Sequence, residues 1–172
     1  GEGSDQTDRN AHSLVICADS GDFHMLFTGD MGKREEEQLL IQADRREGAW
    51  IREHLAHINL LKTAHHGSYG SSCLAFLEAV TNVRLAVISY GKGNSYGHPH
   101  KETMEKLEKA GCWILRTDLL GTIVASTDGE HLTWSPQAGE SMTEGGRVSD
   151  PSSYVINTNT VSYTHLRAHE TR

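Results

Sequence analysis

Short alternating and apolar stretches near the start of the chain predict strands. The apolar stretch 14–17, the turn cluster 19–22 and the second apolar stretch 23–28 predict a β-hairpin. Five later stretches are rich in apolar residues and are bounded by turn residues, as is typical of strands. These further predicted strands span 58–63, 83–89, 112–116, 122–126 and 131–134.

Apolar positions at helical spacing predict the helices. In the Glu-rich segment 33–46 the recurrence at helical spacing comes from Glu36, Leu39, Leu40 and Ala43. The pattern predicts an amphipathic helix there, with the run Glu35–Glu37 expected on a solvated face. Further helices are predicted over 49–57, 73–80 and 100–110. The alternation of strands and helices predicts a layered α/β domain, which can also be described as α+β.

Length and composition fit one domain of this kind. The chain has 172 residues, of which 37% are hydrophobic and 23% charged, enough for a single buried core. We expect the domain to span residues 1–134. Residues 135–172 are predicted to be a flexible tail, because residues 135–153 are rich in Ser, Gly, Glu and Pro. Within it, the string 162–171 looks like foreign, adaptor-derived sequence, which we leave out of the predicted fold.

Charge and cysteine usage narrow the function classes. The net charge of −7 lacks the positive excess of a dedicated DNA-binding module. Three scattered cysteines without CxxC spacing predict reduced thiols. No apolar run approaches the roughly 20 residues of a membrane helix, so this chain has no membrane segment and is expected to be soluble on its own, while its location stays open.

Three sets of polar side chains follow predicted strands, where α/β sheets place their sites. The first is Asp30, which comes after Gly29 at the end of the second strand. A carboxylate in this position can bind a divalent cation. A turn Asp that caps the following helix is the common alternative.

The second set is His65-His66-Gly67-Ser68, after the strand 58–63. The Gly and Ser indicate a loop, in which one imidazole can bind a metal while its neighbour orients substrate or transfers a proton. Isolated surface histidines are an equally weighted alternative.

The third set is the Gly-rich loop 91–100, which contains Asn94, Tyr96 and His98. Pro99 restricts the backbone directly after His98, as suits a ligand held in fixed geometry. A simple loop leading into the helix 100–110 is the alternative. His100 is a weaker candidate second ligand, since it could equally cap that helix.

Taken together, the three sets supply the ligand types of a zinc, manganese or iron hydrolase. We expect a divalent metal cofactor, zinc or manganese, as one or two ions. Such a metal lowers the pKa of a bound water to about 7 and supplies hydroxide at neutral pH.

At this point the chain resembles the metallo-β-lactamase-fold hydrolases, and most closely the C-terminal hydrolase domain of the ComEC competence proteins and their stand-alone relatives. The matching segments run in order through residues 10–126 and include HHGS at 65–68 and NSYGHP at 94–99. The resemblance implies an αββα sandwich with a metal centre at one edge, of which this chain would be the C-terminal half.

The resemblance also implies roles for individual residues. Asp30, His65 and His98 are assigned to the metal, and His66 and Ser68 to catalysis, with the order of the two histidines left open. The remaining assignments, to substrate binding, are Lys62, Asn94 and Tyr96.

One family feature has no match here. The first metal motif, a His-x-Asp/His-x-Asp-His cluster, is not found in residues 1–12. We therefore expect a partial domain with about half a coordination shell, inactive by itself.

The function implied for the parent protein is metal-dependent hydrolysis of phosphodiester bonds during DNA uptake in competence, with DNA as partner and substrate. The resemblance leaves open that the parent is a protein of the bacterial inner membrane. One alternative is a stand-alone hydrolase of a small ester, lactone or cyclic phosphate, because the fold hosts many chemistries. Another is a non-catalytic binding domain.

Overall fold

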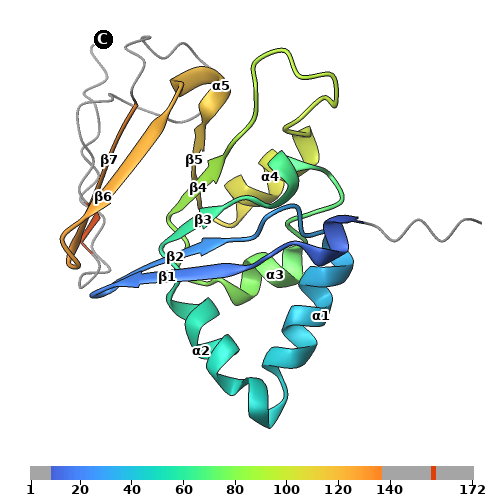
Figure 1. The fold of residues 1–172 in the computed structure, drawn as a ribbon, viewed down its shortest axis with the longest axis vertical. Helices are drawn as coiled ribbons and strands as arrows, with labels where there is room; N and C mark the ends of the chain where they lie inside the picture. Colours follow the sequence, from blue (N-terminus) through green and yellow to red (C-terminus); the bar gives the residue numbers. More distant parts are fainter. Residues whose placement is uncertain (1–8, 137–155, 158–172) are drawn as a thin grey trace, which may run out of the picture.

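The computed structural model describes residues 9–136 and 156–157, and its centre is a five-stranded sheet (Figure 1). The strand order is β1-β2-β3-β4-β5. The hairpin strands β1 and β2 are antiparallel, and β2 to β5 are parallel. The strands span Ile16–Ser20, Phe23–Phe27, Leu60–Lys62, Leu85–Ile88 and Trp113–Arg116. The predicted hairpin and the three strands that follow it are confirmed.

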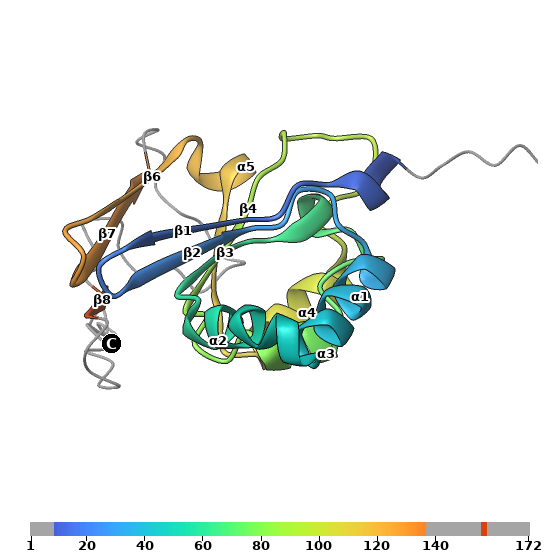
Figure 2. The ribbon, with the colours of Figure 1, turned by 60° about the horizontal axis from the view of Figure 1, so that its bottom comes forward.

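Four helices cover one face of this sheet (Figure 2). They are α1 (Lys33–Ala43), α2 (Ala49–His57), α3 (Leu74–Ala79) and α4 (Lys101–Lys109). The helix predicted over 33–46 ends earlier, at Ala43. Asp44 caps it, with its N–H bonded to the carbonyl of Leu40 at 3.0 Å. The polar residues after it form the 3-10 turn η2 (Arg46–Gly48).

A second, antiparallel sheet lies on the opposite face. It contains β6 (Ile123–Thr127), β7 (His131–Pro136) and β8 (Ile156–Asn157), in that order. The short helix α5 (Thr117–Leu120), which the sequence pattern did not predict, connects β5 to β6. Most of the expected tail, residues 137–155 and 158–172, lies outside the described residues.

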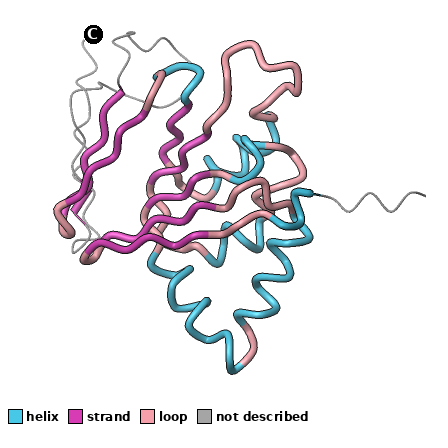
Figure 3. Tube along the Cα trace, viewed as in Figure 1, coloured by secondary structure: helices cyan, strands magenta, loops and turns pink. Residues whose placement is uncertain are grey.

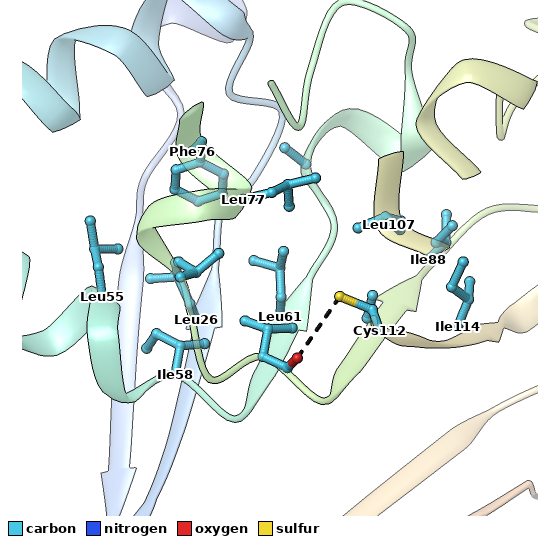
Figure 4. Close-up of a cluster of buried hydrophobic side chains, with 14 of the residues drawn as sticks. Leu26, Leu55, Ile58, Leu61, Phe76, Leu77, Ile88, Leu107, Cys112 and Ile114 are labelled. Atoms are coloured by element: carbon cyan, nitrogen blue, oxygen red, sulfur yellow. Dashed lines mark hydrogen bonds between the residues drawn. The ribbon is translucent and has the colours of Figure 1, made fainter. Parts of the chain in front are cut away.

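The core is divided between the two faces of the five-stranded sheet, because successive side chains of a strand point to opposite faces. Leu26, Leu61, Ala86 and Ile114 lie in one register row and pack against the helices (Figure 4). The neighbouring row contains Met25, Leu60, Leu85 and Trp113 and packs against a cluster with Leu132 and Trp134 of β7. Both faces are therefore buried, which gives a mixed α/β fold in layers.

Two other 3-10 turns, η1 (Arg9–His12) and η3 (Ala64–Gly67), lie near the carboxyl ends of β2 and β3. Because β2 to β5 are parallel, their carboxyl ends lie together at one end of the sheet. The loops after β2, β3 and β4 start from that end (Figure 3). The residues singled out in the sequence lie on these three loops, except Lys62, which is the last residue of β3.

Candidate functional site

Backbone hydrogen bonds hold the three loops against one another. The His65 N–H donates to the carbonyl of Gly29 at 2.9 Å, which joins the loop after β3 to the loop after β2. The His100 N–H donates to the carbonyl of Gly67, also at 2.9 Å, and joins the loop after β4. The loops that carry the three sets of residues therefore lie beside one another.

The two adjacent histidines occupy an unusual backbone conformation. Their φ angles are 47° for His65 and 54° for His66, both in the left-handed region. A side chain in this region costs free energy of order 1 kcal/mol or more per residue, so it persists only where surrounding contacts impose it. The turn lets both imidazoles stand at the same edge of the sheet, which an extended strand would prevent.

His66 and Asp30 face each other across the site. His66 Nδ1 lies 2.6 Å from the carbonyl oxygen of Ser89. A carbonyl oxygen only accepts hydrogen bonds, so Nδ1 carries a proton and the lone pair of the neutral ring is on Nε2. This Nε2 faces Oδ1 of Asp30 at 3.4 Å. Both side chains remain about 40% exposed, at 43% and 41%, so solvent and ligands can reach them.

Asp30 is positioned from a distant part of the sequence. Its N–H donates to the hydroxyl of Ser13 at 3.0 Å. Ser13 precedes β1, so the segment that leads into the hairpin fixes the start of the loop after β2. The sequence analysis did not single out Ser13, since the contact spans 17 positions and leaves no periodic signal.

His98 is fixed by the side chain of Asn94. The His98 N–H donates to Asn94 Oδ1 at 3.0 Å, and Asn94 Nδ2 donates to the His98 carbonyl at 2.7 Å. The amide of Asn94, expected to bind substrate, is thus engaged within its own loop. Burial lowers the pKa of His98, and the neighbouring histidines lower it further. His98 is therefore held as a neutral imidazole at neutral pH.

The imidazoles of the site form one aromatic cluster. The ring of His98 stacks on that of His66, with centroids 6.2 Å apart and planes 19° apart. His65 meets His98 edge to face at 5.7 Å, and His100 does so at 5.0 Å. Tyr96 stacks beside His98 at 5.8 Å. The structure thus brings His65, His66, His98 and Tyr96 together.

His100 occupies the N-cap position directly before α4. Its ring makes no side-chain hydrogen bond to the first turn of the helix. Instead, its Nδ1 accepts a hydrogen bond from the N–H of Tyr69 at 3.3 Å, and the two rings meet edge to face at 5.2 Å. Tyr69 was not predicted to take part in the site. The signal that the sequence offered was an aromatic residue directly after HHGS.

Ser68 and Lys62 lie below the surface of the site. Ser68 is only 8% exposed, and its hydroxyl accepts a hydrogen bond from the Gly70 N–H at 3.4 Å. The ammonium group of Lys62 donates to the carbonyl of Thr63 at 2.8 Å. Burial lowers the pKa of Lys62, while the charge of Asp30 opposes that shift. Lys62 therefore lies close enough to Asp30 for their charges to interact.

Residues at the carboxyl end of β5 hold the start of the loop after β4 in place. The Tyr90 N–H donates to the hydroxyl of Thr117 at 2.9 Å, and this hydroxyl donates to the Tyr90 carbonyl at 2.9 Å. Arg116 binds Asp118 through two hydrogen bonds, of 3.1 and 2.8 Å, and lies over the ring of Tyr90. These contacts fix the direction in which the loop leaves the sheet.

A buried carboxylate supports the segment that follows HHGS. Glu36 of α1 is 0% exposed and accepts hydrogen bonds from the N–H groups of Ser72 and Cys73 at 2.6 and 2.7 Å. The expected solvated face of Glu35–Glu37 is therefore wrong for Glu36. Its spacing with Leu39, Leu40 and Ala43 did place it on the inward stripe, and the two buried N–H groups explain why a carboxylate is found there.

The donor atoms partly fit a divalent cation. Imidazole nitrogen and carboxylate oxygen are zinc and manganese ligands, and a ligating His commonly donates its other N–H to a carbonyl, as His66 does. Two tetrahedral zinc ligands lie about 3.3 Å apart at ordinary bond lengths, close to the 3.4 Å between His66 and Asp30. Among the described residues, however, no group of three or more His, Cys, Asp or Glu residues is arranged to hold a metal ion.

The chain is similar to curated competence and recombination proteins. It is 33% identical over 127 residues to "ComE operon protein 3" of Bacillus subtilis, a match that covers 71% of this chain. It is 34% identical to "Competence protein ComA" of Neisseria gonorrhoeae over 67% of this chain, and 31% identical to "Recombination protein 2" of Haemophilus influenzae over 66%. The match spans only 13–15% of the length of these relatives.

These homologues, at about 30% identity, point to a competence protein of the ComEC family. No family model matches the chain, and no solved structure matches it. Within the part of the chain that the structure describes, none of the helices has both the length and the apolar character required to cross a bilayer.

Proposed function

We propose that this chain is part of a metal-dependent hydrolase of phosphodiester bonds that acts in DNA uptake, with the layers of a metallo-β-lactamase sandwich. The observation that carries the proposal is the His66–Asp30 pair, in which Nε2 and Oδ1 lie 3.4 Å apart. The three loops that hold it start from one edge of a parallel sheet. The competence relatives and the order of the motifs support DNA as the substrate class.

In the proposed site, Asp30 and His66 would hold the cation. Bound there, a zinc or manganese ion supplies hydroxide at neutral pH by lowering the pKa of a water molecule. The hydrogen bond to Ser89 fixes the orientation of His66, and the bond to Ser13 fixes the backbone of Asp30. The pair supplies two protein ligands of the three or four that such a site needs. We propose that His98 is a third ligand.

The remaining side chains have roles that follow from their positions. His98 is neutral because burial lowers its pKa, so its ring can accept a proton or bind the cation. His65 meets His98 edge to face, and its proposed role is to give a proton to a leaving oxygen. Lys62 lies beside Asp30 and contributes attraction for a phosphate. Ser68 is buried, and its contribution is to shape the turn after the histidines.

Metal binding to this chain and to variants tests the proposal. We expect Zn²⁺ binding, followed by isothermal titration calorimetry, to weaken roughly tenfold or more in Asp30→Asn and His66→Ala. The matched control is His54→Ala. His54 Nδ1 also bonds a carbonyl, that of Trp50 at 2.7 Å, on an exposed helix face. This control should bind Zn²⁺ as the wild type does.

Activity supplies the second measurement. The full-length protein that contains this chain should hydrolyse bis(p-nitrophenyl) phosphate when Zn²⁺ or Mn²⁺ is added, and Asp30→Asn should abolish the hydrolysis. Equal Zn²⁺ binding by the wild type and both site variants would refute the proposed centre. Metal binding without hydrolysis of the phosphodiester would contradict the proposed reaction and favour a non-catalytic domain.

A further inference from the structure

Two tyrosines beside the site are exposed far more than large aromatic rings usually are. Tyr69 is 70% exposed and Tyr96 is 77% exposed. Tyr69 lies on the loop after β3, and Tyr96 on the loop after β4. Packing within the described fold explains neither ring, so each leaves most of an apolar surface in water.

The two tyrosines stand at the ends of a continuous row of rings. Tyr96 stacks with His98 at 5.8 Å with planes 21° apart, and His98 meets His100 at 5.0 Å. His100 in turn meets Tyr69 at 5.2 Å. Since His98 also stacks on His66, the row adjoins the proposed reaction centre.

The backbone under each ring is held by a hydrogen bond to a side chain. The Tyr96 N–H donates to Asn94 Oδ1 at 3.2 Å, and the Tyr69 N–H donates to His100 Nδ1 at 3.3 Å. Neither loop therefore needs to be ordered when a ligand arrives. Rigid aromatic rings bind flat partners at a low cost in conformational entropy.

We infer that Tyr96 and Tyr69 stack on the bases of an unpaired nucleic-acid strand and so present the phosphate between them to the site. This inference rests on the proposed function and names the form of its substrate. Every base has a flat π-face that is free in a single strand and covered in a duplex. Lys92 on the loop of Tyr96 and Lys101 after His100 are both exposed and can meet the strand's phosphates.

Binding of short oligonucleotides to the full 172-residue chain tests the inference. Fluorescence anisotropy would compare a labelled oligothymidylate with an abasic strand of the same length, which has the same phosphates and no bases. The wild type should bind the oligothymidylate more tightly. Tyr96→Ala and Tyr69→Ala should each weaken that binding roughly fivefold or more, since stacking on one base has this strength. Binding of the abasic strand should not change.

Two further variants separate stacking from other effects. Tyr96→Phe keeps the ring and should keep the wild-type affinity, whereas a role of the hydroxyl would weaken it and contradict stacking. Trp50→Ala removes another exposed aromatic ring, 60% exposed on α2, and should leave binding of both strands unchanged. A wild type that binds neither strand would overturn the inference. So would a Tyr96→Ala variant that loses affinity for both strands equally, or a wild type that binds a duplex of the same length as tightly as the oligothymidylate.

The inference and the proposed function can fail separately. If the tyrosine variants lose base-dependent binding while Asp30→Asn and His66→Ala still bind Zn²⁺ normally, the metal centre is refuted and the stacking surface stands. If Zn²⁺ binding follows the proposed pattern while Tyr96→Ala binds oligothymidylate as the wild type does, the stacking surface is refuted and the metal centre stands.

Discussion

Replacing Glu36 should destabilise the fold from inside α1, at a distance from the proposed reaction centre. The carboxylate is fully buried and accepts one backbone N–H on each oxygen, from Ser72 at 2.6 Å and from Cys73 at 2.7 Å. These two bonds hold the start of α3 and the end of the loop that contains HHGS. A change at Glu36 therefore acts on the stability of the fold and on the support of that loop.

The magnitude follows from the two hydrogen bonds. In Glu36→Ala both N–H groups lose their partner, and a buried donor without a partner costs about 1–3 kcal/mol. With the cavity left by the side chain, we expect a loss of about 3–5 kcal/mol in the free energy of unfolding. Glu36→Gln keeps one carbonyl oxygen and removes a buried charge, so we expect a smaller loss of about 1–3 kcal/mol.

The pH dependence has a definite sign. Burial raises the pKa of Glu36 above its ordinary value of 4.5, in spite of the opposing hydrogen bonds. The folded state thus takes up a proton at Glu36 at higher pH than the unfolded state does. Its stabilising contribution is complete below pH 4.5 and is lost as pH rises through the folded-state pKa. Glu36→Gln should lack this contribution, so its deficit against the wild type should shrink as pH rises.

Urea unfolding followed by circular dichroism, at several pH values, measures these quantities. Glu37→Gln is the matched control, because Glu37 is exposed one position further along α1 and forms an ion pair with Lys33 at 3.6 Å. It should change the free energy of unfolding by about 0.5 kcal/mol or less. Equal stabilities for Glu36→Ala and Glu37→Gln would refute the role assigned to Glu36. A deficit of Glu36→Gln that grows with pH would refute the direction of the pKa shift.

Three other perturbations give separate tests. Gly67→Ala should lower the free energy of unfolding in urea by about 2–4 kcal/mol, because φ is +79° and a Cβ would lie 2.7 Å from the proline ring after His98. At Gly93 φ is +72° and an added Cβ would meet nothing within 4 Å. Gly93→Ala should therefore lose only the backbone contribution, about 1–2 kcal/mol. Cys112 is buried and burial raises its pKa to about 11, so iodoacetamide should label it, by mass spectrometry, only after denaturant is added; labelling in the native state would contradict the burial. Asp118→Asn should lower the free energy of unfolding by about 1–2 kcal/mol at neutral pH. Although burial acts in the opposite direction, the hydrogen bonds from Arg116 lower the pKa of Asp118. The wild type should therefore lose this contribution as pH falls below 3.8, and the variant should not. Identical acid unfolding of the two would contradict the pairing.

Much of the fold could be predicted because apolar periodicity reports which face of each element is buried. Strands such as β4 and helices such as α2 agree with the predicted ranges to within two residues. The end of α1 and the whole of α5 could not be predicted in this way. A four-residue helix such as α5 is shorter than the window over which a helical period can be recognised.

The site was partly predictable for a topological reason. Asp30 and the HHGS histidines each follow a strand, and parallel strands place such residues at one edge. Contacts between distant segments gave no signal: the Ser13 hydroxyl under Asp30 and the Tyr69–His100 pair depend on how loops fold back. The Glu36 position shows the opposite case, where spacing indicated burial and only the charge of the residue argued against it.

The left-handed backbone turn at His65 and His66 can be kept without the two imidazole side chains. Glycine adopts left-handed φ angles without a steric penalty, so His65→Gly or His66→Gly would preserve the shape of the loop and relieve it. Variants selected for thermal stability alone could therefore carry glycine at both positions and lack both imidazoles. A sound melting curve therefore carries no information about whether His65 and His66 are still present.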